Sequence, residues 1–135
     1  MRTLQEVKDF FQNDVYATGT TGIEIVEARP GYAKVTLDVD ARHMNAGGRV
    51  MGAVYYTMAD FAFAVANNYD MEEGMTVTLT SQINFLDAAR GNTLTAEAHV
   101  IRDGRNTTFY RVDVTDELGT QIATVSSNGF RIRKK

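Results

Sequence analysis

A chain of 135 residues that is 44% hydrophobic and 23% charged has the composition of one soluble globular domain, residues 1–135. Its formal net charge of -3 argues against a nucleic-acid-binding protein held by phosphate contacts. The chain has no cysteine, and its two histidines, His43 and His99, lie far apart, so we expect no disulfide, thiol chemistry or metal site.

The first residues predict a short helix. The N-terminus lacks the basic and then apolar pattern of a signal peptide, which predicts a cytoplasmic protein. Thr3 and Glu6 have the spacing of a capping box. Apolar residues then recur on one helical face: Leu4, Val7, Phe10 and Phe11. We expect an amphipathic helix over about residues 3–13 that covers part of a sheet, followed by a linker at residues 19–22.

Two strands follow. Alternating apolar and polar residues predict strands at 23–29 and 33–39, joined as a hairpin by a turn that contains the only proline. Residues 40–49 break this alternation. Two consecutive glycines near the end of that stretch suit a backbone that bends sharply and approaches another group closely.

Residues 50–66 carry one charged side chain, Asp60, in an otherwise apolar run. Such a run predicts a helix buried on several sides, and at about 24 Å it is too short to span a bilayer. Burying an ionised carboxylate is costly unless it is paired or hydrogen-bonded. We therefore expect Asp60 to carry chemistry, with a structural role, such as pairing with an arginine, as the alternative.

Three or four antiparallel strands are predicted between residues 77 and 132, separated by short turns. One of them has an apolar series, Val77 to Phe85, that is interrupted by Ser81. The fold class is therefore α+β, with one long curved antiparallel sheet wrapped around a central buried helix. One sheet of this size leaves part of the helix uncovered, so we expect a second copy of the chain to cover it.

This order of elements resembles the hotdog fold and, within it, the acyl-CoA thioesterases of the phenylacetate-pathway type. The matching positions are Asn45, Gly48, Met51-Gly52-Ala53, Met58-Ala59-Asp60 and Phe61-Ala62-Phe63. The strand at residues 80–86 and the turn at 104–105 also resemble the family, so the similarity covers about residues 22–132. The chain departs from the family at Met51, which replaces a histidine and cannot donate a hydrogen bond, and at Ala53, which replaces a glycine.

The resemblance implies a thioester hydrolase that needs no cofactor, since coenzyme A is part of the substrate. Asp60 would be the general base or nucleophile, and the backbone N–H groups of Gly52 and Ala53 would polarise the carbonyl. Asn45 would orient the water or the carboxylate. Further candidates would bind the substrate: Gly48, Met51, Phe61, Thr80, Ser81, Arg102, Arg105 and Asn106. The arginines and Asn106 would hold coenzyme A phosphates.

Each of these residues also has a structural interpretation. Asn45 would brace its loop, the hydroxyl residues would be plain strand positions, and the arginines would be solvated turn charges. Aromatic residues of the helix would pack in the core or line an acyl pocket: Tyr55, Tyr56, Phe61 and Phe63. His43 is expected on the loop surface.

Helix geometry predicts how the site is assembled. Ala53 and Asp60 are seven residues apart, about 10.5 Å along a helix axis, so one carbonyl cannot contact both. Antiparallel helices from two copies would bring Ala53 of one near Asp60 of the other. This predicts an obligate homodimer, or a dimer of dimers, that acts on an acyl-CoA or acyl-carrier thioester, with no nucleic-acid or membrane partner.

Two other functions remain as alternatives. The first is a non-catalytic protein that binds acyl-CoA or another acyl ligand, for which Met51 is the main support. The second is a hotdog dehydratase or hydratase, for which His43 is the nearby candidate histidine.

Overall fold

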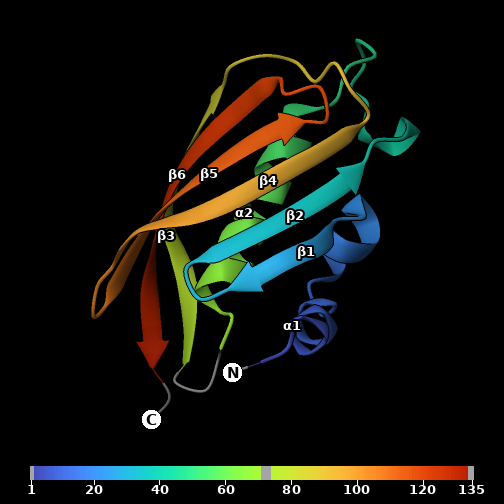
Figure 1. Cartoon of the computed structure of the whole chain (residues 1–135). Coiled ribbons are helices and arrows are strands. Elements are labelled where there is room, and N and C mark those ends of the chain that lie inside the picture. The colour runs from blue at the N-terminus through green and yellow to red at the C-terminus, as the bar shows by residue number, and fades with distance from the viewer. Residues whose placement is uncertain (1, 71–73, 134–135) are drawn as a thin grey trace.

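The computed structural model describes residues 2–70 and 74–133, which form a six-stranded antiparallel sheet with a 16-residue helix on one face (Figure 1). The strands are β1 (Glu24–Arg29), β2 (Tyr32–Asp38), β3 (Gly74–Phe85), β4 (Thr93–Asp103), β5 (Thr107–Asp116) and β6 (Gln121–Arg133). The helices are α1 (Leu4–Phe11), the π-helical η1 (Tyr16–Thr21), the 3-10 helix η2 (Ala41–His43) and α2 (Gly52–Asn67). In the sheet the order is β1-β2-β4-β5-β6-β3.

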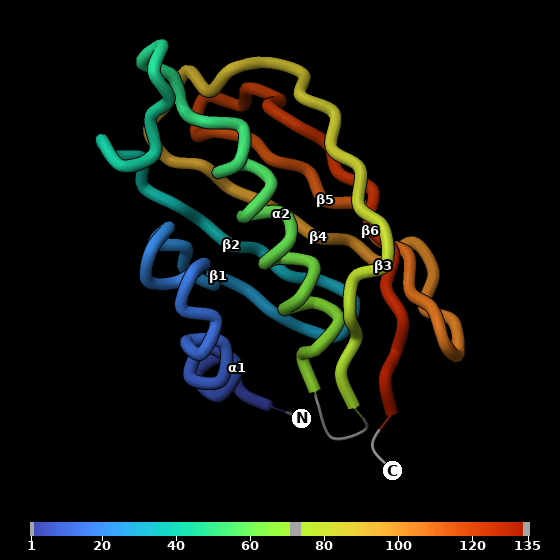
Figure 2. Tube along the Cα trace, turned by 180° about the vertical axis from the view of Figure 1, so that it is seen from behind, coloured from blue at the N-terminus to red at the C-terminus, as the bar shows by residue number. Residues whose placement is uncertain are grey.

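The core lies between α2 and the middle of the sheet. Helix α2 packs mainly on β2, β4 and β5, and Figure 2 shows the sheet curving around it. Every second residue of these strands is buried against the helix: Ala33, Val35, Leu37, Leu94, Ala96, Ala98, Val112 and Val114. The predicted sheet, its hairpin and its central helix are therefore confirmed. Within the two described ranges, no helix has both the length and the apolar character needed to cross a membrane.

Helix α1 begins at the predicted capping box. The Glu6 backbone N–H donates to Thr3 Oγ1 at 3.2 Å, and the Thr3 N–H donates to Glu6 Oε1 at 3.0 Å. Helix α1 contacts the edge strand β1 and buries Val7 and Phe11.

The linker predicted at residues 19–22 is wrong, because most of it belongs to η1. Ala17 and Thr21 are buried, so they anchor this segment against the core. The N–H of Gly22 donates to the Ala17 carbonyl at 3.1 Å, and Gly22 itself has a φ of 89° that ends the helical turn. Burial and local hydrogen bonds thus override a composition that is typical of a loop.

Strand β3 is an edge strand, although its alternation suggested a buried face. It pairs with β6 and does not pair with β4, which follows it in the chain. Val77 is 37% exposed and Leu79 and Phe85 are each 57% exposed. The strand itself is confirmed, but its apolar series is not buried within one copy of the chain.

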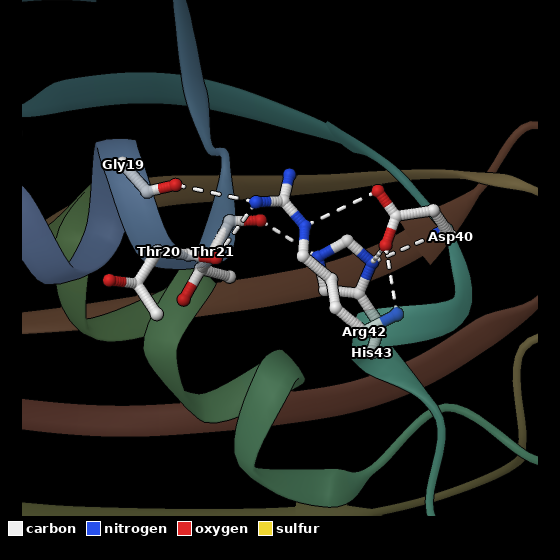
Figure 3. A network of polar contacts seen from close by, with 6 residues as sticks. All are labelled: Gly19, Thr20, Thr21, Asp40, Arg42 and His43. Atoms are coloured by element: carbon white, nitrogen blue, oxygen red, sulfur yellow. Dashed lines mark hydrogen bonds and ion pairs between the residues drawn. The ribbon is translucent and has the colours of Figure 1, made fainter.

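The expected surface position of His43 is wrong, because this residue is 3% exposed. The backbone N–H of Asp40 donates to His43 Nδ1 at 2.9 Å, and His43 Nε2 lies 2.8 Å from the Thr21 carbonyl oxygen (Figure 3). A carbonyl oxygen only accepts hydrogen bonds, so Nε2 carries the proton. Arg42 adds hydrogen bonds to the carbonyls of Gly19 and Thr20 (Figure 3). This network ties the loop that precedes α2 to η1.

Candidate active site

A pocket of about 370 Å³ lies between α2 and the segment that follows α1. Its lining residues are Asp14, Val15, Tyr16, Ala17, Tyr56, Thr57, Asp60, Phe61 and Ala64. Most of the helix residues among them lie on the side of α2 that faces away from the middle of the sheet. Positions 56, 57, 60 and 64 on this side are half-buried, whereas positions 58, 59, 62 and 63 are buried. The pocket therefore joins one side of the central helix to the N-terminal part of the chain.

Asp60 is the carboxylate that α2 contributes to this pocket. Its side chain makes no hydrogen bond or ion pair with any residue that the structure describes. Burial raises the pKa of Asp60, and the negative charge of Asp14 raises it further. The helix thus holds a carboxylate of increased proton affinity at the wall of a cavity. This arrangement differs from the salt-bridged structural role that the sequence left open.

The start of α2 offers backbone donors. The N–H of Met51 donates to the His43 carbonyl at 2.9 Å, and the N–H of Val54 donates to the Met51 carbonyl at 2.9 Å. Between them, the N–H groups of Gly52 and Ala53 have no acceptor among the described residues. Unpaired N–H groups at a helix N-terminus attract negative charge.

The ring of Phe85 packs against Gly52, so a larger residue at position 52 would require this ring to shift. A Cβ atom at Gly52 would lie 2.9 Å from a ring carbon of Phe85, closer than packed atoms allow. A glycine therefore lets the strand residue cover the first turn of α2 while the N–H groups of that turn stay free.

The loop before α2 is braced by Asn45. Its Oδ1 accepts hydrogen bonds from the N–H groups of Gly47, at 3.0 Å, and Arg49, at 3.1 Å. The N–H of Gly48 donates to the Asn45 carbonyl at 3.0 Å, and the φ of 77° at Gly48 requires a glycine-like backbone. Asn45 Nδ2 has no partner in the described part of the chain, so Asn45 braces the loop and keeps one amide group available.

One copy of the chain brings only some of the predicted residues together. Asp60 and Phe61 line the pocket, together with Tyr56. Tyr55 and Phe63 belong to the core, where the Phe63 ring packs edge-to-face on Tyr110 at 5.3 Å between centroids.

The remaining candidates lie elsewhere. Thr80 and Ser81 are on the edge strand β3, where Ser81 Oγ lies 2.6 Å from Ser127 Oγ. Arg102 is near the end of β4, and Arg105 and Asn106 are in the β4–β5 turn, at the opposite end of the sheet from the start of α2 (Figure 1).

The pocket wall formed by Asp14, Val15 and Tyr16 was not predicted from the sequence. These residues carry no motif, and they lie between a predicted helix and a predicted linker. The sequence offers only an acidic residue followed by two large apolar ones, and the structure leaves Val15 67% and Tyr16 60% exposed.

Comparisons with known proteins give consistent matches. Residues 47–123 match the family described as the thioesterase superfamily. Acyl-coenzyme A thioesterase PaaI of Escherichia coli is 30% identical over 130 residues, which are 95% of this chain and 90% of that protein. The crystal structure of thioesterase HI1161 from Haemophilus influenzae is similar with a TM-score of 0.87 at 25% identity, covering 98% of this chain and 92% of that one.

A third match is the Streptococcus mutans protein smu.793, whose crystal structure contains acetyl-CoA. Its TM-score is 0.76 at 26% identity, covering 84% of this chain and 90% of that one. These similarities confirm the predicted hotdog fold and the resemblance to thioesterases of the PaaI type.

Proposed function

This chain belongs to the thioesterase superfamily, and on that premise we propose that it is an acyl-CoA thioesterase that releases a free acid and coenzyme A. The observation that carries the proposal is the position of Asp60. Its carboxylate is free of hydrogen bonds and ion pairs with the described residues and lines a cavity walled by apolar and aromatic side chains. A fold gains no stability from such a group, so a catalytic use explains it.

Asp60 would act as a general base or as a nucleophile. As a base it would take a proton from water, whose oxygen forms the new bond to the thioester carbon. The carbon–sulfur bond then breaks, and the proton reaches the departing sulfur, so that the products are an acid and a thiol. A carboxylate with a raised pKa is a stronger base, which suits this role.

The N–H groups of Gly52 and Ala53 would stabilise the negative charge that develops on the carbonyl oxygen. They lie eight and seven residues before Asp60, about 12 and 10.5 Å along the same helix axis. A carbonyl bound to these amides is thus beyond the reach of Asp60 in its own chain. We infer that each site combines Asp60 of one copy with Gly52 and Ala53 of a second.

Strand β3 supports pairing of two copies. It leaves one side of a 12-residue strand without a neighbour in the sheet, and exposed edges of this length readily pair with another chain. Two β3 strands related by a two-fold axis would run antiparallel and extend the sheet. The same axis would set the two α2 helices antiparallel, as the shared site requires.

A mixing experiment tests the shared site. Asp60→Asn removes the base, and Ala53→Pro removes one N–H in the first turn, where a helix tolerates proline. We expect each variant alone to be nearly inactive in thiol release from acyl-CoA. Unfolded together and refolded as an equal mixture, they should recover about a quarter of the wild-type rate, because half of the random pairs would contain one intact site. No recovery from folded, mixed dimers would contradict a site shared between copies.

Met51 favours one alternative, a protein that binds acyl-CoA without hydrolysing it. Its side chain is 52% exposed and caps no N–H at the start of α2, where the family has an imidazole. Titration calorimetry with a panel of acyl-CoAs, run beside thiol-release assays, separates the two functions. Turnover by the wild-type protein supports the enzyme. Tight binding with no turnover for any acyl group would establish the binding protein instead.

A further inference from the structure

The pocket contains a second carboxylate, Asp14, on the wall opposite α2. Hydrogen bonds fix its backbone: its N–H donates to the Phe11 carbonyl at 3.0 Å, and its carbonyl accepts from the N–H and hydroxyl of Thr18, each at 3.0 Å. The Asp14 side chain makes no hydrogen bond or ion pair with the residues described in the structure. Desolvation raises the pKa of this carboxyl as well.

Among the residues that the structure describes, no cation lines the pocket beside these two carboxylates. The lining contains no lysine, arginine or histidine, and its other titratable groups are the phenols of Tyr16 and Tyr56. Asp60 is the only charged residue of α2, and the strands beneath the helix face it with apolar side chains. Arg42 is bonded to the carbonyls of η1 and to Asp40. Asp60 is half-buried and Asp14 is exposed, and two like charges that line one partly desolvated cavity repel each other.

We propose that Asp14 is a positioning residue of the thioesterase site: its carboxylate lines the same cavity as Asp60, acts on Asp60 through its charge and excludes acyl groups that end in an anion. The inference rests on the proposed function for its catalytic meaning. The two carboxylates and their shared cavity do not depend on that function.

The first consequence concerns Asp60. Each negative charge makes ionisation of the other less favourable, so loss of the Asp14 charge lowers the pKa of Asp60. The second consequence concerns the acyl group. The apolar and aromatic lining accepts a neutral acyl or aryl group, whereas the monothioester of a dicarboxylic acid would place a third carboxylate beside Asp14.

A titration that needs no turnover tests the first consequence. The carboxyl carbon of Asp60, labelled with ¹³C and assigned with Asp60→Asn, is followed by NMR against pH in the wild type, Asp14→Asn and Asp9→Asn. Asparagine is isosteric with aspartate and preserves the backbone contacts at position 14. Asp9 lies on α1 outside the pocket, so Asp9→Asn removes one negative charge from the protein and leaves the Asp14 carboxylate in the pocket.

We expect the Asp60 titration to move to lower pH in Asp14→Asn and to stay at the wild-type value in Asp9→Asn. Asp14→Glu, which restores the charge, should return it toward the wild type. Equal Asp60 titrations in Asp14→Asn and Asp9→Asn would overturn the proposal, whether or not the protein turns over acyl-CoA.

Selectivity supplies the second test. The kcat/KM for a straight-chain acyl-CoA is compared with that for an ω-carboxyl acyl-CoA of the same chain length. Asp14→Asn should raise the relative value for the anionic substrate about tenfold, whereas Asp9→Asn should not. If the wild type shows no turnover, the proposed function fails, and the ratio of the two dissociation constants serves as the readout instead. An unchanged ratio in Asp14→Asn would contradict exclusion of anions by this residue.

Discussion

Two aspartates of this chain occupy opposite surroundings. Asp116, at the end of β5, accepts hydrogen bonds from the backbone N–H groups of residues 90, 91, 118 and 120, all between 2.9 and 3.1 Å. Asp60, in the middle of α2, has no such partner among the described residues and lies at a cavity. Chemically identical side chains therefore serve different purposes: one organises turns and the other is left free.

Their pKa values move in opposite directions for this reason. Burial alone raises the pKa of Asp116, but the donated N–H bonds from Gly91, Arg90 and Thr120 outweigh it and hold that pKa well below its usual range. Burial and the charge of Asp14 raise the pKa of Asp60 with nothing to offset them. The number of backbone donors around a buried carboxylate thus separates a structural aspartate from a candidate catalytic one.

The largest expected effect is on turnover. Asp60→Asn should lower kcat for thiol release by about 10²–10⁴, the usual contribution of a general base, and more if Asp60 is the nucleophile. Asp116→Asn should keep kcat within about twofold of wild type per folded molecule. Steady-state assays at matched concentrations of folded protein, checked by circular dichroism, measure both. An Asp60→Asn enzyme that retains most of its kcat would remove the basis for contrasting the two residues.

The next effect is on stability. Asp116→Asn replaces an acceptor oxygen with an NH₂ group that faces backbone donors, so we expect the free energy of unfolding to fall by about 2–3 kcal/mol. Asp113→Asn is the matched control on the same strand, because it removes only a surface ion pair with Arg111 and should cost less than about 1 kcal/mol. Urea unfolding at neutral pH and fixed protein concentration gives both values. Equal losses would mean that the hydrogen bonds to Asp116 contribute no special stability.

The smallest expected effect is on how the free energy of unfolding depends on pH, where Asp116 and Asp60 should act in opposite directions. Asp116 has a lowered folded-state pKa, so its contribution is present above the unfolded-state pKa of about 4 and is lost as pH falls through the folded-state value. Asp60 has a raised folded-state pKa, so the folded state binds its proton more tightly, and that contribution is lost as pH rises through the folded-state value.

Asp60→Asn should therefore be slightly more stable than the wild type at neutral pH, and the difference should vanish on acidification. Asp116→Asn should be less stable than the wild type at neutral pH, and this difference in the free energy of unfolding should also shrink on acidification. Urea unfolding at a series of pH values from about 2 to about 8 tests this pair of trends, because the Asp116 contribution is lost only below about pH 4. Destabilisation by Asp60→Asn at neutral pH would show that the charged carboxylate stabilises the fold.

Elements with a strong local signal could be predicted from the sequence. The capping box set the start of α1, the apolar run set α2, and period-two alternation set the strands. Burial in β3 could not be predicted, because alternation does not tell which strands become neighbours. His43 was misjudged for a related reason: its hydrogen bond to the Thr21 carbonyl joins positions 22 residues apart and leaves no local pattern. The segment η1 was misjudged because burial against the core overrides a composition that is typical of a loop.

Some residues of the candidate site could likewise be predicted from the sequence, and others could not. Asp60 stood out because a charge inside an apolar helix is visible in one segment, and the structure places it at a cavity. Asp14 did not, because its importance comes from lying across that cavity from another element. The roles of Asn45, the helix amides and the β4–β5 turn remain predictions, since a single copy does not bring these groups to Asp60.

The contacts of Arg42 and His43 have a consequence for protein engineering. They link η1, whose first residues line the pocket, to the loop from which α2 starts. Libraries that remodel residues 14–17 to accept new acyl chains can therefore keep the amide-bearing tip in register, provided that these two side chains are left in place.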